Sequence, residues 1–285
     1  MEEGIDTNTT SLSTLLIHEV FEYIDDDYKL LIHKEGSTDD ERSKKLSIEL
    51  IMRSGLEEYF KDVLLSSKHR SSLCNEAARG GYLRVLKWAK DNDCCVFQSH
   101  SISLAARNGH LDCLIWLREN GCEWNSATSY WAAEGCHMNC LMWARENGCD
   151  WHSKTCAVAA ERGFLNCLIW ARENGCEWDA STCSSAAVNG YLDCLIWARE
   201  NGCEWDSDTC SAAARGGHLF CLIWAKEQGC DWDSWTCYYA ASEGHLGCLI
   251  WSREHGCPWF RQDCIDIARN NNQWHVVEWL NSQKL

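Results

Sequence analysis

DTCSAAARGGHLFCLIWAKEQGCDWD, residues 208–233, decides the fold, because closely similar stretches recur along most of the chain. The recurrence follows a column of tryptophans 27 residues apart, with one further Trp at a distance of 28 before it and another after it: Trp88, Trp116, Trp143, Trp170, Trp197, Trp224, Trp251 and Trp279. Self-similarity at such a period is typical of a solenoid, in which each unit buries its apolar face by stacking on its neighbours. The chain therefore contains eight repeats.

One unit predicts a helix, a turn, a second helix and a loop. Residues 207–209 offer side-chain oxygens for capping, and residues 210–215 are rich in alanine, which predicts a short first helix. The glycines at 216–217 end it. Apolar residues in 219–225 are spaced to share one face of a second helix, and Gly229 suits the left-handed residue that closes that helix.

Three runs resemble the core of an ankyrin repeat: AARNGHLDCLIWL (105–117), AAVNGYLDCLIWA (186–198) and AARGGHLFCLIWA (213–225). The resemblance covers roughly residues 71–285. An ordinary ankyrin repeat has about 33 residues, and the residues missing here fall where that family places its β-hairpin. We therefore expect an all-α protein, an α-solenoid of shortened ankyrin-like repeats with helical caps, in which the last of the eight repeats is itself a cap. Its units are similar to the GCxW-type repeats of some protist and giant-virus proteins.

Composition and charge limit the classes of partner. The chain has 26 basic and 42 acidic residues and a formal charge of −16, which argues against nucleic-acid binding through a basic surface. Much of the acid lies in two columns: Glu119, Glu146, Glu173, Glu200, Glu227 and Glu254, then Glu123, Asp150, Glu177, Glu204 and Asp231. These columns predict either a solvated face or a surface that selects a basic partner.

The N-terminal sequence MEEGIDTNTTSL is acidic and polar where a signal peptide would be basic and then apolar. No stretch approaches the roughly 18 consecutive apolar residues of a membrane span. We expect a monomeric, intracellular protein of the cytoplasm or nucleus, in the host cell if the source is viral, with no membrane association.

The 21 cysteines fall almost entirely in three columns, one in the first helix, one in the second helix and one in the closing loop. In the ankyrin pattern that the chain resembles, this second-helix position holds a buried, Val-like residue, so the resemblance implies that these cysteines are small core side chains. Stacked repeats should separate equivalent residues by about 8–10 Å, beyond the roughly 7 Å that a disulfide permits between Cα atoms. No C-x-x-C pair is present. We therefore expect close to 21 free thiols, no metal site and no cofactor, and we retain metal binding by the cysteines as the alternative function.

Residues 1–10 are expected to be disordered and residues 11–70 to form a helical N-terminal cap. Within it, residues 11–32 resemble the first half of an F-box, the motif that docks a protein onto the adaptor subunit of cullin-type ubiquitin ligases. That resemblance implies apolar adaptor contacts by Leu16, Phe21 and Ile24. The early proline and the later Trp-containing part of an F-box are absent. A cap that shields the first repeat and a degenerate F-box that makes the chain a substrate-recognition adaptor are both retained as interpretations.

Residues repeated in every unit are expected to pack. The first Trp column should supply the largest apolar burial in each unit, and the second, Trp124, Trp151, Trp178, Trp205, Trp232 and Trp259, should cover helix surface that the short loop leaves bare. One turn position holds either His or an aromatic residue, which indicates packing rather than catalysis: Tyr82, His110, His137, Phe164, Tyr191, His218 and His245. No phosphate-binding loop, metal-ligand pair or nucleophile motif is present, so we expect no catalytic residues and no enzymatic activity.

Exposed positions that vary between repeats are the candidate binding sites. Ankyrin-like stacks use the face of the first helix for protein recognition, and aromatic residues occur on it at Tyr130, Trp131, Trp235, Tyr238 and Tyr239. Tyr and Trp dominate binding hot spots. The sequence thus predicts a non-catalytic scaffold that binds a protein partner through this face, with aromatic packing between neighbouring units as the alternative role of these five residues.

Overall fold

The computed structural model describes residues 67–93 and 98–283. The predicted disordered segment 1–10, the F-box-like segment 11–32 with Leu16, Phe21 and Ile24, and most of the predicted N-terminal cap lie outside these residues. The described chain divides into two compact units, Met1–Val96 and Phe97–Leu285, and each is described by itself.

The described residues form sixteen helices in eight pairs, and they contain no strand. The first helices of the pairs are α5 (Ser67–Gly80), α7 (Ser99–Arg107), α9 (Ala127–Glu134), α11 (Thr155–Glu161), α13 (Ala180–Val188), α15 (Ser207–Gly216), α17 (Ser234–Glu243) and α19 (Arg261–Asn270). The second helices are α6 (Leu83–Asp91), α8 (Leu111–Glu119), α10 (Met138–Glu146), α12 (Leu165–Glu173), α14 (Leu192–Glu200), α16 (Leu219–Glu227), α18 (Leu246–Glu254) and α20 (Trp274–Ser282). The predicted all-α solenoid is confirmed.

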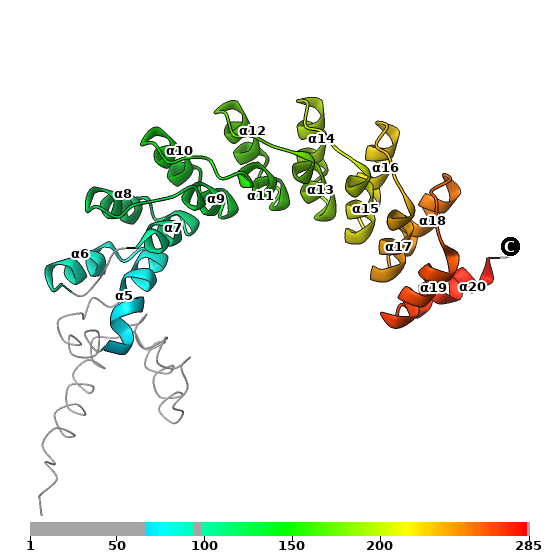
Figure 1. The fold of residues 1–285 in the computed structure, drawn as a ribbon, viewed down its shortest axis with the longest axis horizontal. Helices are drawn as coiled ribbons and strands as arrows, with labels where there is room; N and C mark the ends of the chain where they lie inside the picture. Colours follow the sequence, from blue (N-terminus) through cyan, green and yellow to red (C-terminus); the bar gives the residue numbers. More distant parts are fainter. Residues whose placement is uncertain (1–66, 94–97, 284–285) are drawn as a thin grey trace, which may run out of the picture. The chain divides into compact units, whose positions relative to one another are not determined.

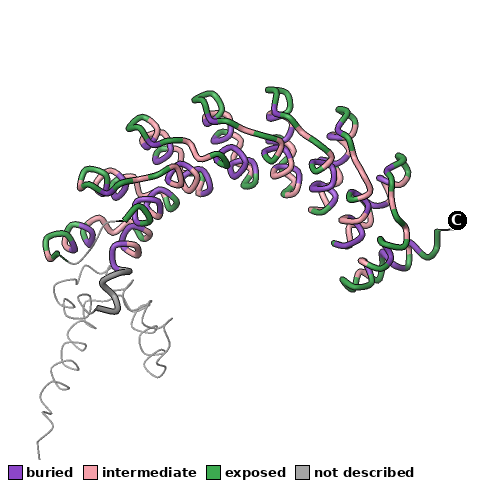
Figure 2. Tube along the Cα trace, in the orientation of Figure 1, coloured by how far each residue is buried: buried purple, intermediate pink, exposed green. Residues whose placement is uncertain are grey.

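Within the unit Phe97–Leu285, the two helices of each pair lie in different rows (Figure 1). The first helices, α7 to α19, form the row on the inner side of the curve, and the second helices form the outer row. Buried residues gather where neighbouring helices meet, and exposed residues gather at the outer tips of the second helices (Figure 2). The first helices therefore pack one against the next along the inner row.

Helix starts differ slightly from the sequence prediction. The cap of α15 is Asp206, whose carboxylate accepts a hydrogen bond from the Asp208 backbone N–H at 3.0 Å, so the helix begins at Ser207, earlier than the predicted residue 210. Asp179 and Asp233 cap α13 and α17 in the same way. A carboxylate at this position also complements the positive end of the helix dipole.

The core is built from leucine, alanine and cysteine. The largest fully buried side chain of each repeat is a second-helix leucine, such as Leu168, Leu195 or Leu222. Alanine pairs such as Ala186-Ala187 are 0% exposed, which lets the first helices approach closely. In the first Trp column, Trp170 and Trp197 are half-buried on the outer row.

The turn aromatics pack between repeats, as expected. The His218 ring lies against Gly190 of the preceding repeat, and a Cβ added to Gly190 would fall 2.4 Å from its Nδ1 atom. Gly190 also has a φ of +78°, which L side chains rarely adopt. His218 is thus a spacer between consecutive turns, and burial lowers its pKa.

Candidate functional site

Tryptophans of the closing loops link consecutive repeats on the outer row. Five of the six loop tryptophans meet the second-helix Trp of the next repeat edge to face, with ring centroids 5.6–5.8 Å apart: Trp124–Trp143, Trp151–Trp170, Trp178–Trp197, Trp205–Trp224 and Trp232–Trp251. Such aromatic pairs contribute about 0.5–1.5 kcal/mol beyond the area they bury. We call these contacts the outer tryptophan ladder.

A basic side chain covers the other side of each loop Trp. Arg172 lies 4.6 Å from the centroid of Trp178, and its Nη1 donates a hydrogen bond to the Cys176 carbonyl at 3.1 Å. Lys226 takes the same place over Trp232 at 4.6 Å. Each indole is thereby held between a cation of its own repeat and an indole of the next. The ladder is part of the framework, as expected for residues that recur in every unit.

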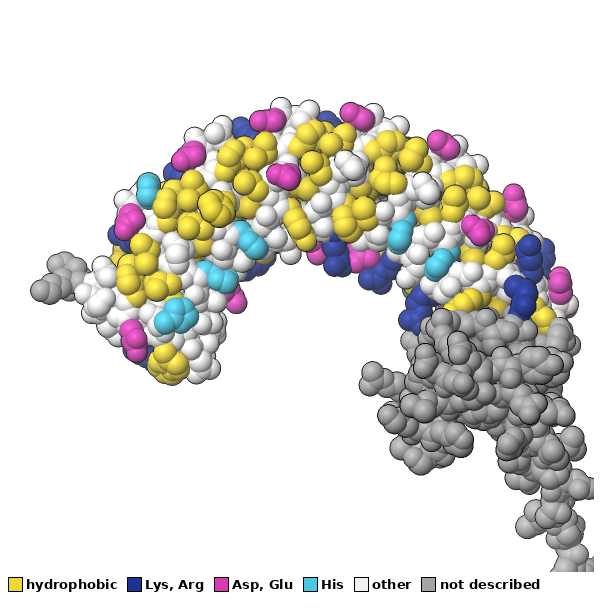
Figure 3. Space-filling view, turned by 180° about the vertical axis from the view of Figure 1, so that it is seen from behind, with side chains coloured by type: hydrophobic (Ala, Val, Ile, Leu, Met, Phe, Trp, Pro, Cys, Tyr) yellow, Lys and Arg dark blue, Asp and Glu magenta, His cyan; other side chains and the backbone are white. Residues whose placement is uncertain are grey.

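Hydrophobic side chains form a band that repeats along one face, with acidic side chains along the outer edge (Figure 3). The acidic residues of the first column, such as Glu146 and Glu200, are exposed. Their exposure fits both predicted roles of the acidic columns, a solvated face and a surface for a basic partner.

Of the five predicted binding residues, Tyr130 and Trp131 on α9 are half-buried and packed. The Arg107 guanidinium lies 4.5 Å from the centroid of Trp131, and the Tyr130 ring meets His152 at 5.2 Å. Burial raises the pKa of the Tyr130 phenol. These contacts come from the repeats before and after α9, so packing between units accounts for much of both rings.

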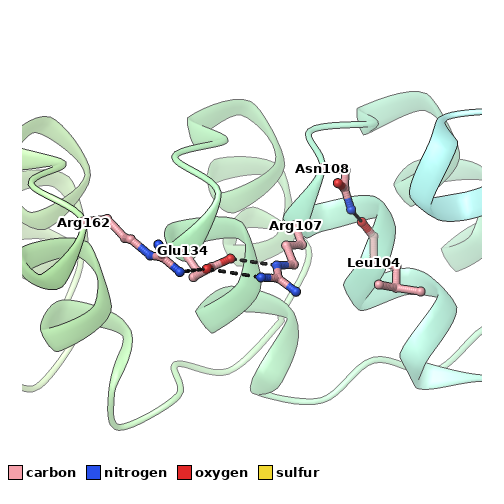
Figure 4. A network of polar contacts seen from close by, with 5 residues as sticks. All are labelled: Leu104, Arg107, Asn108, Glu134 and Arg162. Carbon is pink, nitrogen blue, oxygen red and sulfur yellow. Dashed lines mark hydrogen bonds and ion pairs between the residues drawn. The ribbon is translucent and has the colours of Figure 1, made fainter.

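An ion network holds this arrangement in place (Figure 4). The Glu134 carboxylate accepts hydrogen bonds from Arg107 Nε at 2.8 Å and from Arg162, and it is only 8% exposed. Burial alone raises the pKa of Glu134, but the two guanidinium groups outweigh it and hold that pKa below its usual range. The network joins the ends of three consecutive first helices.

On α17, the rings of Trp235, Tyr238 and Tyr239 contact one another and form one cluster. The sequence alone does not specify these contacts. Trp235 stacks on Tyr239 at 5.6 Å and meets Tyr238 edge to face at 5.2 Å. Trp235 is 53% exposed, and both tyrosines are half-buried. We call these three residues the α17 aromatic cluster.

A cavity of about 330 Å³ opens beside this cluster, between α17 and α19. Its lining includes Trp235, Tyr238 and Phe260, together with Asp263 of α19. Sequence reasoning did not single out Phe260, which is 66% exposed. The sequence does contain a sign of it: Phe260 occupies the repeat position at which Asp179, Asp206 and Asp233 cap the earlier first helices.

Between α9 and α17, the inner row carries small side chains at the equivalent positions. They are Ala157 and Val158 on α11, Ser184 and Ser185 on α13, and Ser211 and Ala212 on α15. The aromatic residues of α9 and those of α17 are therefore separated by three repeats that carry only small side chains at these positions.

The thiols differ in part from the prediction. The described cysteines other than Cys74 are free and, except for Cys136, buried, but Cys74 is disulfide-bonded, so fewer than 21 thiols are free. The structure also brings a helix thiol next to the closing-loop thiol of its own repeat: the Cys156 thiol donates a hydrogen bond to the Cys176 carbonyl at 4.0 Å, and its interaction with the Cys176 thiol raises the pKa of Cys156 and lowers that of Cys176.

In the part of the chain that the structure describes, no three His, Cys, Asp or Glu side chains are grouped closely enough to hold a metal ion. None of its helices is long and apolar enough to cross a membrane.

Comparison with known proteins gives a likeness of shape. No family model matches the sequence, and no curated protein matches it. Among solved structures, the chain is similar to the crystal structure of the human ASB11 ankyrin repeat domain, with a TM-score of 0.49 and 18% sequence identity. The match covers 65% of this chain and 99% of the ASB11 chain.

Proposed function

We propose that this protein is a non-catalytic scaffold that binds a protein partner across the inner row, with the α17 aromatic cluster as the main contact. The single observation that supports this is the exposure of Trp235, an indole 53% open to solvent in a row whose neighbouring positions carry small side chains. Tyr and Trp are the side chains most enriched at binding hot spots.

The regular frame strengthens the proposal. Indoles of the outer tryptophan ladder contact the next repeat and a cation of their own repeat. Trp235 contacts only aromatic residues of its own helix among the ring contacts that the described residues make. Stacking of the repeats therefore does not account for Trp235, and binding of a partner does.

Tyr130 and Trp131 take a secondary place in the proposed surface, because Arg107 and His152 already cover part of both rings. Their removal should weaken the stack as well as any binding. Trp235 and Tyr238 are the residues whose removal separates the two effects.

The test is affinity capture of partners from the native cell by the wild-type chain and by Trp235→Ala/Tyr238→Ala. Hot-spot truncation costs about 2 kcal/mol or more, so the double variant should hold its partner roughly 30-fold more weakly or lose it. Phe220→Ala is the matched control, since Phe220 on the outer helix α16 is 78% exposed and lies outside the proposed surface.

Circular dichroism and urea unfolding of both variants complete the design. An unchanged set of captured proteins with the double variant would refute the proposal. Loss of the folded state in that variant would show that these aromatic residues stabilise the stack, and the proposal would fail for that reason.

A further inference from the structure

The cavity between α17 and α19 combines three aromatic rings with a single acid. Six residues line it: Ser234, Trp235, Tyr238, Phe260, Asp263 and Cys264. Asp263 is the one member of this set that carries a charge at neutral pH. Cys264 is 1% exposed, and burial raises the pKa of its thiol to about 12, so the thiol is neutral.

Basic residues close in sequence to the cavity are engaged elsewhere. Arg261 donates a hydrogen bond to the Leu280 carbonyl at 2.6 Å, Arg269 pairs with Asp266 at 3.2 Å, and Arg253 lies over Trp259 at 4.3 Å. The charge that the lining presents is therefore negative.

Aromatic faces attract cations because the ring quadrupole is negative above the plane, and organic ammonium groups are bound in proteins by aromatic cages of this kind. An adjacent carboxylate adds Coulombic attraction. This protein already places cations on its rings: Arg215 lies 5.8 Å from the centroid of Tyr239, and Arg172 lies 4.6 Å from that of Trp178.

The cavity exists because the repeat pattern is broken at two places. Trp235 stands where the preceding repeats carry Ser181 and Asp208, and Phe260 stands where they carry a capping Asp. No side-chain cap bonds the start of α19, in contrast to α13, α15 and α17. An Asp at position 260 would cap the helix, so the exposed Phe gives up that capping bond without gaining burial.

The size of the cavity limits its ligand. About 330 Å³ is at the lower end of the roughly 300–1,000 Å³ range of ligand pockets, which suits one long side chain. A purely apolar side chain would make no use of Asp263, and an acidic one would be repelled by it.

We propose that the cavity formed by Trp235, Tyr238, Phe260 and Asp263 binds the cationic head of a basic side chain, an ammonium or a guanidinium, presented by the protein partner. The inference rests on the proposed function and adds to it the chemistry that the partner must offer. In the complex, the cation lies against the aromatic faces and Asp263 balances its charge.

The test uses four small probes on the full chain: the Nα-acetyl amides of lysine, Nε-trimethyl-lysine, arginine and norleucine. Binding is followed by NMR through the indole N–H resonance of Trp235, which the Trp235→Phe variant identifies. At least one cationic probe should shift this resonance saturably in the high millimolar range, and neutral norleucine should not. Trimethyl-lysine binding above lysine identifies an ammonium cage, and arginine binding above both identifies guanidinium stacking.

Two variants with matched controls locate the site. Phe260→Leu removes a ring but keeps an apolar side chain, and it should weaken cation binding about 3- to 30-fold. Asp263→Asn should weaken it about 2- to 5-fold, the range of exposed ion pairs. Phe220→Leu and Asp266→Asn make the same changes outside the cavity and should leave binding unchanged. Asp266 lies one turn away on the same helix.

The outcomes separate this inference from the proposed function. If no probe binds, or if norleucine binds as well as the cations, the cation site is refuted, even where the partner is still lost with Trp235→Ala/Tyr238→Ala. If the cations bind as described but the captured partners do not depend on Trp235, the cation site stands and the proposed protein interface is refuted.

Discussion

The outer tryptophan ladder and the α17 aromatic cluster use the same residue types for different purposes. In the ladder, each loop indole meets a second-helix indole of the next repeat at 5.6–5.8 Å and a cation of its own repeat at 4.5–4.6 Å. In the cluster, Trp235 stacks within its own helix and is 53% exposed. An aromatic residue present in every unit has a partner in every unit, whereas one that breaks the pattern has no equivalent partner and stays open to solvent.

The largest expected effect comes from breaking the ladder. Trp178→Ala removes contacts with both Trp197 and Arg172, and we expect a loss of about 3 kcal/mol in the free energy of unfolding. Trp235→Ala, in contrast, should cost less than about 0.5 kcal/mol, as is usual for exposed positions. Urea unfolding followed by circular dichroism measures both. Equal losses of unfolding free energy in the two variants would show that the ladder and the α17 aromatic cluster do not differ in their contribution to stability.

The second-helix cysteines make the frame sensitive to alkali. Burial raises the pKa of Cys194 from 9.0 to about 11. The neutral thiol is thus favoured in the folded state, so its contribution is complete below pH 9 and is lost as the pH rises toward 11. The loss is up to about 2.7 kcal/mol, since one pKa unit corresponds to about 1.4 kcal/mol. The difference in unfolding free energy between wild type and Cys194→Ala should shrink over this window. A constant difference would contradict it.

A substitution of Glu134 tests whether its ion network stabilises the α9 region, where Arg107 covers Trp131, whereas Trp235 of the α17 aromatic cluster is 53% exposed. Glu134→Gln leaves Arg107 and Arg162 without their shared carboxylate, and we expect a loss of about 2 kcal/mol at neutral pH. Because the folded-state pKa of Glu134 is lowered, its contribution is present above about pH 4.5 and is lost as the pH falls through the folded value. The two proteins should therefore converge in stability at acid pH, as urea unfolding at several pH values would show. A constant difference there would refute the role of the charge.

The smallest expected effect comes from replacing the cation that lies over a ladder Trp. Arg172→Lys should cost less than about 0.5 kcal/mol, because Lys226 already occupies the equivalent place over Trp232 and donates to the Cys230 carbonyl at 3.2 Å. Arg172→Ala removes the cation and should cost about 1 kcal/mol. Thermal unfolding of Arg172→Lys and Arg172→Ala measures both losses. If Arg172→Lys and Arg172→Ala lost the same unfolding free energy, the stem and charge of a lysine at position 172 would contribute no more to stability than an alanine does.

The sequence by itself determined the number of helix pairs and their order. The 27-residue spacing of the Trp column, the glycine turns and the alanine-rich first helices are local patterns, and each helix depends mainly on residues within one or two turns. The closing Gly229, with a φ of +83°, follows from the same local chemistry. Even the residue that breaks the capping column, Phe260, is visible in the sequence once the Asp column is aligned.

Only the tertiary structure decided which of these side chains are covered. Trp131 is covered because Arg107 reaches it from the preceding repeat, and Glu134 holds that guanidinium in place. Trp235 lacks such a neighbour, and with Phe260 it borders a cavity that the helix pattern alone does not specify. The physical reason is that solvent exposure depends on atoms brought together from neighbouring repeats, about 27 residues apart in the chain, whereas helix formation depends on residues a few positions apart.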